Sequence, residues 1–297
     1  MKKLLPEVCT IQYGFPFDSA KFSDSNGMPL IRIRDVVRGC SETYTTEEYK
    51  SEYIVHENDL LIGMDGEFNI AKWGKTPALL NQRVCRLAPK DSIDKDYLFY
   101  FMPIALKRIE EKTPFVTVKH LSAKELNKIE IPVLSLEEQR KIAETLSKVD
   151  KLIAFRDQQL AKLDELVKAR FVEMFGDINV NNKKWMTYPL GELCTIVRGG
   201  SPRPIERYLG GTIPWIKIGD ATTGENIYLN STKEYIIQEG VKKSRMIKAG
   251  SLIFANCGVS LGFARIITFD GCIHDGWLAM EDIDEKLDKI FLLYSLN

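Results

Sequence analysis

The longest regular pattern of apolar and polar positions lies in the middle of the chain, between residues 137 and 175. Apolar side chains recur there three or four positions apart, with Arg156 and Arg170 at two of the seam positions, which is typical of the seam of a coiled coil. Ser135 and Glu138 form a capping box before it, and Gly176 is placed as a C′ glycine after it. At 1.5 Å per residue the predicted helix is about 58 Å long, the length of about 17 base pairs. The seam that a partner would cover consists of Ile142, Leu146, Val149, Ile153, Leu160, Leu163, Val167 and Met174.

Shorter apolar runs on both sides of this helix, separated by Gly, Asn and Asp, predict strands and turns. Examples are the runs 30–33, 60–62 and 84–87. Residues 97–109 and 122–128 are expected to be helices, and residues 129–132 a strand. The pattern therefore predicts mixed α/β structure on either side of the long helix.

The pattern of the first 100 residues recurs about 185 positions later. Residues 5–11 match residues 190–196, and residues 29–35 match residues 214–220. Residues 58–62 match residues 250–254 at a separation of about 192, which one loop insertion would explain. A repeat of this length indicates a duplicated domain. The predicted fold class is α/β (α+β), with repeated domains at 1–135 and 177–297 joined by a long coiled-coil-forming helix at 136–176.

The predicted central helix has two interpretations. It could be an ordinary core helix folded back on one domain. Its length and its capped position between two copies of one domain favour a spacer. An amphipathic helix of this length would leave its seam exposed to water, so we expect a partner for it.

Composition and charge limit the partners without naming one. The chain has 41 basic and 41 acidic residues, so binding to DNA would need a local basic face rather than bulk charge. Residues 183–265 offer one, with 12 basic against 6 acidic residues. No apolar run is long enough to span a bilayer and the N-terminus has no signal-peptide pattern, so we expect a cytoplasmic protein without membrane partners. The six cysteines form no Cys-x-x-Cys pair and are interpreted as reduced, mostly buried thiols.

Motifs for enzymatic chemistry are sparse. The sequence has no phosphate-binding loop, no dinucleotide fingerprint, no amino-methyltransferase motif and no nucleophile elbow. Its three histidines are far apart, so no histidine-based metal site and no cofactor are expected. One pattern keeps an alternative open: Asp35, Glu48 and Lys50 resemble the spacing with which some nucleases hold a divalent metal.

Polar side chains in the predicted loops are the better candidates for function. Arg, Asn and Gln can bond bidentately to base edges, while Lys can hold phosphates. The two copies agree at apolar positions and differ at these polar ones, as two domains that recognise different sequences would; drift of solvated loops would give the same divergence. The candidate DNA-binding residues are Lys72, Lys75, Asn81, Gln82, Arg83, Arg198, Arg203, Lys217, Asn256 and His274.

Several segments resemble the specificity subunit of type I restriction-modification systems. The run Ile129-Glu130-Ile131-Pro132 through Glu138-Gln139 to Ile142 resembles the family's entry into its spacer helix. The segment from Phe171 through Phe175-Gly176-Asp177 to Trp185 and Leu190-Gly191-Glu192 resembles its exit. Asn81-Gln82-Arg83-Val84 and Gly199-Gly200-Ser201-Pro202 also fit the family.

This resemblance implies a DNA-recognition subunit without catalytic residues of its own. Each repeat would recognise one half of a bipartite double-stranded DNA target, and the helix would set the gap. The helix would also bind methyltransferase (modification) subunits, which use S-adenosylmethionine to methylate adenine, and a restriction/translocase subunit would join them. The alternatives are the nuclease above and a structural adaptor that bridges proteins.

The resemblance departs from the family pattern at the C-terminus. Asn297 corresponds to about Ile104 of the first repeat, so counterparts of residues 105–176 are expected to be missing. Two hypotheses follow: the chain is a truncated product or fragment, or its helix self-associates with that of a second copy.

Overall fold

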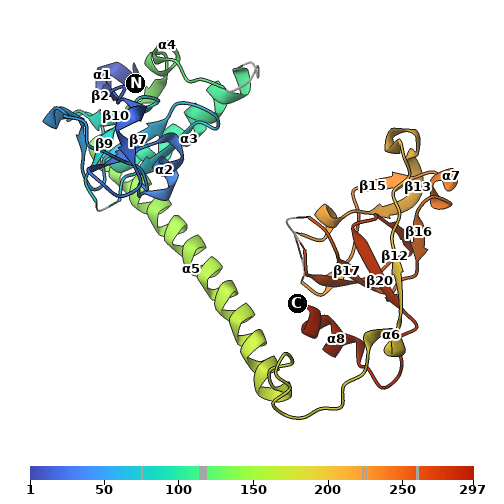
Figure 1. Cartoon of the computed structure of the whole chain (residues 1–297). Coiled ribbons are helices and arrows are strands. Elements are labelled where there is room, and N and C mark those ends of the chain that lie inside the picture. Colours follow the sequence, from blue (N-terminus) through green and yellow to red (C-terminus); the bar gives the residue numbers. More distant parts are fainter. Residues whose placement is uncertain (75, 114–118, 223, 225, 259–260) are drawn as a thin grey trace. The chain divides into compact units, whose positions relative to one another are not determined.

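The computed structural model describes residues 1–74, 76–113, 119–222, 224, 226–258 and 261–297. The chain divides into two compact units, Met1–Gln159 and Leu160–Asn297 (Figure 1). Helix α5 (Leu136–Phe175) is continuous across the division, so each unit contains one end of it. No helix of the described ranges is long and apolar enough to cross a membrane.

The first unit is built on two sheets. The first has the order β2-β10-β7-β8 with antiparallel neighbours, and the second has the order β3-β5-β4-β9-β6, in which β4 and β9 run parallel. A short antiparallel pair, β1 and β11, lies beside them. The strands are β1 (Lys2–Leu4), β2 (Cys9–Tyr13), β3 (Phe22–Ser23), β4 (Met28–Ile31), β5 (Tyr44–Thr45), β6 (Ile54–Val55), β7 (Leu60–Gly63), β8 (Asn69–Lys72), β9 (Ala78–Leu80), β10 (Val84–Pro89) and β11 (Glu130–Pro132). The helices are α1 (Leu5–Val8), η1 (Ser19–Lys21), α2 (Ile33–Arg38), η2 (Ser51–Tyr53), α3 (Lys95–Lys112) and α4 (Ala123–Asn127).

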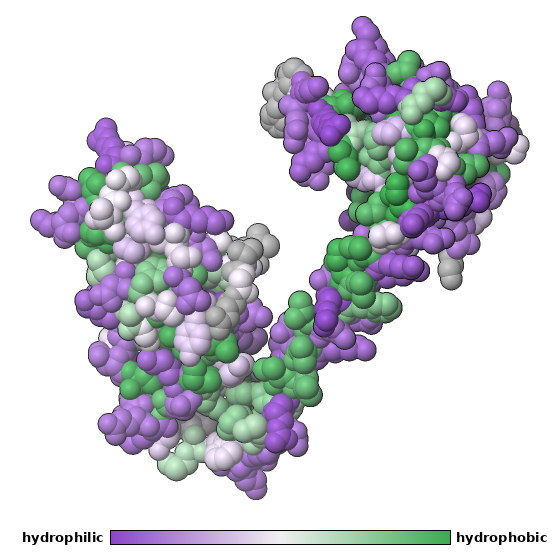
Figure 2. All heavy atoms as spheres, turned by 180° about the vertical axis from the view of Figure 1, so that it is seen from behind, coloured by the Kyte–Doolittle hydropathy of each residue, from purple (hydrophilic) through white to green (hydrophobic). Residues whose placement is uncertain are grey.

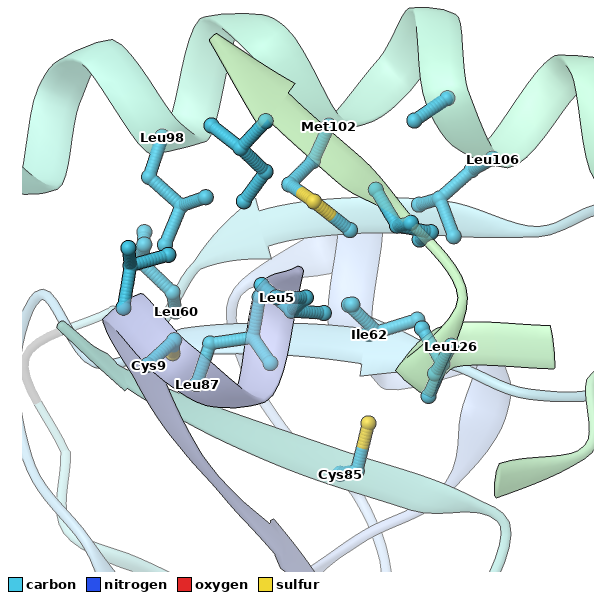
Figure 3. Close-up of a cluster of buried hydrophobic side chains, with 14 of the residues drawn as sticks. Leu5, Cys9, Leu60, Ile62, Cys85, Leu87, Leu98, Met102, Leu106 and Leu126 are labelled. Atoms are coloured by element: carbon cyan, nitrogen blue, oxygen red, sulfur yellow. The ribbon is translucent and has the colours of Figure 1, made fainter. Parts of the chain in front are cut away.

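Helix α3 covers one face of the first sheet and closes the main core of this unit (Figure 3). Leu98, Met102 and Leu106 recur every fourth residue, so they share one face of α3 and are fully buried. They meet the side chains of Leu60 and Ile62 on β7. Burial of each such side chain contributes about 2 kcal/mol to the stability of the unit.

The second unit repeats this arrangement. Its sheets have the orders β12-β20-β17-β18-β14 and β15-β13-β19-β16. The strands are β12 (Thr195–Arg198), β13 (Leu209–Ile216), β14 (Tyr228–Leu229), β15 (Glu234–Ile236), β16 (Arg245–Ile247), β17 (Leu252–Ala255), β18 (Ala264–Ile267), β19 (Gly271–Ile273) and β20 (Trp277–Glu281). The helices are α6 (Leu190–Leu193), η3 (Ile205–Arg207), η4 (Ile218–Asp220), α7 (Gln238–Val241) and α8 (Lys289–Leu296).

The two units share topology and register, as the duplicated pattern predicted. β10 lies between β2 and β7 in the first unit, and β20 lies between β12 and β17 in the second. The parallel pair β4 and β9 has its counterpart in β13 and β19. The paired residues correspond as well: Leu30 with Leu79 and Leu60 with Leu87 in the first unit, and Trp215 with Cys272 and Leu252 with Met280 in the second. The predicted α/β fold class is confirmed.

The strand predicted over residues 30–33 is too long. β4 ends at Ile31, and Arg32 is the N-cap of α2. The Asp35 carboxylate accepts the Arg32 backbone N–H at 2.8 Å, which satisfies a donor at the start of the helix. Asp220 accepts the Lys217 N–H at 2.8 Å in the second unit, so this cap is duplicated too.

The cysteines follow the predicted pattern in four of six cases. Cys9, Cys85, Cys194 and Cys272 are buried thiols, whereas Cys40 and Cys257 are exposed. Burial raises the pKa of Cys9 and of Cys85 to about 12, so both remain protonated near neutral pH. The equivalent cysteines Cys9 and Cys194 both belong to cores, which fits their predicted packing role.

Helix α5 agrees closely with the helix predicted over 137–175. The Ser135 hydroxyl accepts the Glu138 N–H at 3.3 Å and the Glu138 carboxylate accepts the Ser135 N–H at 3.1 Å, so the capping box forms. Gly176 has a φ of +80° and donates its N–H to Val172 O at 2.8 Å. Figure 2 shows apolar side chains along the surface of this helix. The eight predicted seam residues are between 38% and 61% exposed, so the described residues leave the seam open.

Each end of α5 is held by the equivalent helix of its own unit. In the first unit, the buried Gln139 side chain accepts the Asp94 N–H just before α3 at 2.8 Å and donates to Leu134 O at 2.9 Å. In the second unit, Phe171 and Phe175 pack on Phe291 of α8, with ring centroids 5.5 Å and 4.9 Å apart. The first end of the helix therefore enters the core of its unit, where Ala143 is buried, and the second end packs on α8 through half-buried rings.

Candidate nucleic-acid interface

Two segments cross at one edge of the first unit. We call residues 14–17, which follow β2, the strap, and residues 81–83, which follow β9, the recognition loop. Phe15 donates its N–H to Leu80 O at 3.0 Å, and Gln82 donates its N–H to Phe15 O at 2.9 Å. A Cβ at Gly14 would overlap the carbonyl group of Asn81, so only glycine lets the two backbones approach this closely. The crossing fixes where the side chains of both segments lie.

The three residues of the recognition loop differ in accessibility. Asn81 is buried and its Oδ1 accepts the Gln82 N–H at 2.9 Å, so its amide shapes the turn. Gln82 and Arg83 are exposed. The Arg83 guanidinium lies 3.2 Å from Nδ1 of His120 and 3.7 Å from the carboxylate of Asp65. The His120 ring and the Asp65 carboxylate are themselves 2.5 Å apart. An arginine held in this way is oriented before it meets a partner.

Lys72 does not lie in a loop, contrary to the prediction. It is the last residue of β8, and its ammonium group is 2.8 Å from the Asp96 carboxylate and 5.0 Å from the centre of the Phe99 ring. A contact from Lys72 to a phosphate would first have to break this pair. The predicted site residue Lys75 lies outside the described residues.

The same crossing is present in the second unit, with strap residues 199–202 and recognition-loop residues 274–276. Gly199 donates its N–H to Trp277 O at 2.9 Å, and Gly200 donates its N–H to Ile273 O at 3.0 Å. They correspond to the bonds from Gly14 N–H to Val84 O and from Phe15 N–H to Leu80 O in the first unit. A Cβ at Gly199 would overlap the carbonyl oxygen of His274, as one at Gly14 would overlap Asn81. The backbone of the crossing is therefore duplicated, whereas its side chains differ.

Asp275 organises the polar side chains of the second crossing. Its carboxylate accepts the Ser201 hydroxyl at 2.9 Å, is 3.5 Å from the Arg203 guanidinium and is 3.0 Å from the His274 ring. The Arg198 guanidinium donates to the Asp275 backbone oxygen at 3.2 Å. Burial alone would raise the pKa of Asp275, but the Ser201 hydrogen bond and these cations outweigh it and hold the pKa below its usual value. The predicted residues Arg198, Arg203 and His274 thus form one cluster around a carboxylate that sequence reasoning did not select.

Lys217 and Asn256 lie at the margins of this cluster. The Lys217 ammonium group is paired with the Glu234 carboxylate and lies 5.8 Å from the centre of the Trp215 ring. The Trp215 ring in turn lies 5.6 Å from that of His274. Asn256 is half-buried, and its backbone N–H donates to Gly276 O at 2.9 Å. Of the predicted cations of this unit, Arg198 and Arg203 are the exposed ones.

The structure does not assemble the nuclease pattern of Asp35, Glu48 and Lys50. Asp35 is 1% exposed and caps α2. Glu48 and Lys50 are exposed and line a surface pocket whose lining does not include Asp35. Over the described stretches of the chain, no group of three or more His, Cys, Asp or Glu residues is arranged to hold a metal ion.

Comparison with known proteins finds a matching family model and several relatives. The family model for the type I restriction modification DNA specificity domain matches residues 1–165 and 182–297. The specificity subunit of the type I restriction enzyme EcoBI from Escherichia coli is 41% identical over 164 residues, or 54% of this chain and 34% of that protein. The specificity subunit of MjaVIII from Methanocaldococcus jannaschii is 24% identical over 269 residues, or 82% of this chain and 62% of the relative. The chain therefore spans less than two thirds of the length of these relatives.

Solved structures share the fold. The type-I restriction-modification system S subunit from M. genitalium aligns over 100% of this chain and 76% of its own, with a TM-score of 0.51 and 15% identity. A chain from a structure of a type I R-M system aligns over 100% of this chain and 78% of its own, with a TM-score of 0.55 and 16% identity. At this identity the likeness concerns the fold.

Proposed function

The chain belongs to the type I restriction modification DNA specificity family, and from this premise we propose that it recognises a two-part DNA sequence, one half with each repeat. The proposed domains are residues 1–135 and 177–297, with the spacer helix at 136–176. In this role the chain carries no active site, and the chemistry belongs to partner subunits. Such a protein works where the cell's DNA is, which for this chain we take to be the cytoplasm.

One observation carries this proposal: the same backbone crossing occurs twice with different polar side chains. Asn81 in the first unit is replaced by His274 in the second, and Asp65 is replaced by Cys257. Apolar positions that hold the sheets correspond, so the framework is common to both. A shared framework with different exposed donors and acceptors suits two half-sites of different sequence.

Side-chain chemistry suggests how each half would be recognised. Gln82 and Arg83 extend from the first recognition loop and can bond to the major-groove edges of adenine and guanine. Arg198, Arg203 and His274 provide equivalent donors in the second unit. Lys72, Lys75 and Lys217 would contact phosphates, and Asn81 and Asn256 would hold loop geometry or reach a base edge. Both units also carry carboxylates beside these cations, which orient the cationic side chains and which DNA phosphates would have to compete with.

Helix α5 is proposed to set the gap between the half-sites and to bind the methyltransferase subunits. Its 40 residues correspond to about 60 Å of helix. The exposed seam from Ile142 to Met174 is a large apolar stripe, and stripes of this kind need a partner. A helix from another subunit or from a second copy of the chain would cover it. A restriction/translocase subunit would join the assembly when DNA is cleaved.

The decisive experiment compares adenine methylation in cells with and without the gene, by methylome sequencing. We expect one bipartite adenine motif to disappear when the gene is removed. Exchanging the recognition-loop residues of one repeat should then change one half of this motif and leave the other half intact. An unchanged methylome in an otherwise active system would count against the proposal.

Two further measurements address the partners and the nuclease alternative. Light scattering on the purified chain tests self-association, since a strict, well-folded monomer would exclude pairing of α5 between copies. DNA cleavage by the isolated chain that disappears with Lys50→Ala would restore the nuclease hypothesis. We expect no cleavage, because Asp35 is buried whereas Glu48 and Lys50 are exposed.

A further inference from the structure

A pocket lined by aromatic side chains lies beside the crossing of the first unit. Its lining consists of Phe15, Phe17, Glu48, Tyr49, Lys50 and Tyr53, and its volume is about 320 Å³. The Phe15 ring lies 5.0 Å from that of Phe17 and 5.4 Å from that of Tyr53. Phe17 is buried and supports the floor, while Phe15 and Tyr49 are 36% and 44% exposed. Phe15 and Tyr49 are therefore the partly exposed aromatic side chains of the lining that a ligand could contact.

The loop that forms one wall of this pocket is anchored to the sheet. Arg86 of β10 donates from its guanidinium to Ile54 O at 2.8 Å and to Glu52 O at 2.9 Å. Gln12 of β2 donates its side-chain amide to Glu52 O at 2.9 Å. The Glu47 carboxylate also accepts the Asp18 N–H at 2.7 Å, which ties this loop to the end of the strap. The pocket is thus formed before any ligand arrives, which lowers the entropic cost of binding.

The pocket is continuous with the proposed DNA contact. Phe15 belongs to the strap, whose backbone carbonyl accepts the N–H of Gln82 in the recognition loop. Gly14 keeps these two backbones in contact. Phe15 therefore both lines the pocket and holds the backbone of the recognition loop.

We propose that this pocket receives a single nucleobase that has left the base stack of the first half-site. Aromatic faces stack on any base, and a pocket at the small end of the range for ligand sites suits one planar ring. The Glu48 carboxylate can accept a hydrogen bond from an exocyclic amine. The Lys50 side chain is 82% exposed and can reach the phosphate of the displaced nucleotide. This inference rests on the proposed function, because it assumes that the first unit binds DNA.

The second unit differs at the strap: its own pocket beside the crossing is lined by Trp215 and His274, and no ring comes from the described strap residues 199–202. Gly200 occupies the strap position of Phe15, and a Cβ there would lie 2.8 Å from the Lys243 carbonyl oxygen. An aromatic side chain could not be placed at this position without moving the backbone. We therefore expect an extruded base in the first half-site only, which makes the second half-site an internal control.

The test uses the full chain assembled with its methyltransferase subunits and duplexes of the target that the methylome names. Each duplex of one set carries one mismatch, and the mismatch is placed at a different position of the first half-site in each duplex. A second set is built in the same way for the second half-site. A mismatched base costs less to extrude, so one position in the first half-site should show binding about tenfold tighter than in the intact duplex. Tyr49→Ala should abolish this gain, and Tyr49→Phe should retain it because stacking remains.

Tyr235→Ala in the second unit is the matched control, since Tyr235 is 42% exposed and should leave the gain unchanged. If the Tyr49→Ala chain still binds the mismatched duplex more tightly, the gain in affinity would come from the methyltransferase, and the inference would be overturned. Equal gains in both half-sites, or no gain in the first, would also overturn it. A change in subunit assembly with no change in the mismatch effect would assign the pocket to a protein partner instead. If even the intact target is not preferred over a scrambled duplex, the proposed function itself fails.

Discussion

The two repeats of this chain agree in backbone and differ in the side chains that the backbone presents. Gly14 and Gly199 make the same close approach to the following loop, and the strands on either side pair in the same register. Around this common crossing, the first repeat places an arginine between a histidine and a carboxylate, whereas the second gathers two arginines around one aspartate. The difference teaches that one backbone crossing accommodates two different sets of polar side chains, as the proposed recognition of two different half-sites requires.

The largest effect should come from placing a side chain at the crossing. Gly199→Ala would force the strap and the recognition loop of the second unit apart, because the new Cβ overlaps the His274 carbonyl oxygen. We expect a loss of about 3 kcal/mol in the free energy of unfolding of this unit, and loss of recognition of one half-site only. Denaturant unfolding and methylome sequencing measure the two effects.

Gly191→Ala is the control for this substitution. Gly191 is exposed in α6, and a Cβ there meets no atom of the described residues within 4 Å. It should leave unfolding unchanged or stabilise the helix by about 0.5–1 kcal/mol. Equal effects of the two substitutions would mean that the crossing does not constrain the unit.

A substitution in the seam should act on both half-sites alike. Ile153→Asp places a charge on an exposed apolar position of α5, so the isolated chain should unfold as before while its assembly with a partner helix weakens. We expect partner affinity to fall by about 100-fold, since burial of an unpaired charge is costly. Glu165→Ala, an exposed position outside the seam, should change affinity little. Selective loss of one half-site would contradict the role assigned to α5.

Asp275→Asn tests whether one carboxylate organises the second cluster. The substitution keeps the shape and removes the charge that faces Arg203 and His274, so recognition of the second half-site should weaken by about tenfold. The first half-site should be unaffected, and Asp65→Asn should produce the mirror result. Binding to duplexes altered in one half-site at a time measures both.

The pKa of Asp275 adds a pH dependence to this comparison. Because the folded-state pKa is lowered, the carboxylate stabilises the fold above its unfolded pKa of about 3.9, and this contribution is lost as pH falls through the lower folded value. The wild-type chain should therefore exceed Asp275→Asn in stability at neutral pH and approach it once the pH has fallen below the lowered folded-state pKa. Unfolding curves that differ equally at both pH values would contradict this account.

The smallest effect on stability is expected at Gln82. Gln82 is exposed and its bonds to the strap use backbone atoms, so Gln82→Ala should leave the free energy of unfolding within about 0.5 kcal/mol. Discrimination at one base pair of the first half-site should nevertheless fall by about tenfold. Asn81→Ala, by contrast, removes a buried amide that shapes the turn and should cost stability. A larger loss of stability at Gln82 than at Asn81 would reverse the two roles.

Much of the fold could be predicted because its causes are local. The capping box at Ser135, the 3-4 spacing of apolar residues and Gly176 are all signals within the segment that they define, and the helix was placed to within one residue. The duplication helped as well, because corresponding strands of the two copies show the same apolar pattern and support each other's prediction. The start of α2 at Arg32 was missed because Arg32 is not a typical N-cap residue. The carboxylate that accepts the free N–H at the helix start comes from Asp35, within the first turn of the helix.

The candidate site was harder to predict because its contacts join distant segments. The pair of Lys72 with Asp96 and the bond from Ser201 to Asp275 depend on how strands and helices pack, which residue spacing does not reveal. Sequence reasoning selected Arg203 and His274 for their chemistry but not the aspartate between them. Equally, it assigned Glu48 and Lys50 to a metal pattern, whereas the fold places them around aromatic rings.

The glycine at each crossing has a consequence for how such a chain can change over generations. Strap and loop meet through main-chain atoms, so under the proposed function substitutions at their outward positions would alter the DNA sequence that is bound and leave the fold intact. Variation in target preference and retention of a stable scaffold are thereby uncoupled. A lineage can acquire a new specificity one exposed residue at a time, in one repeat while the other keeps its own.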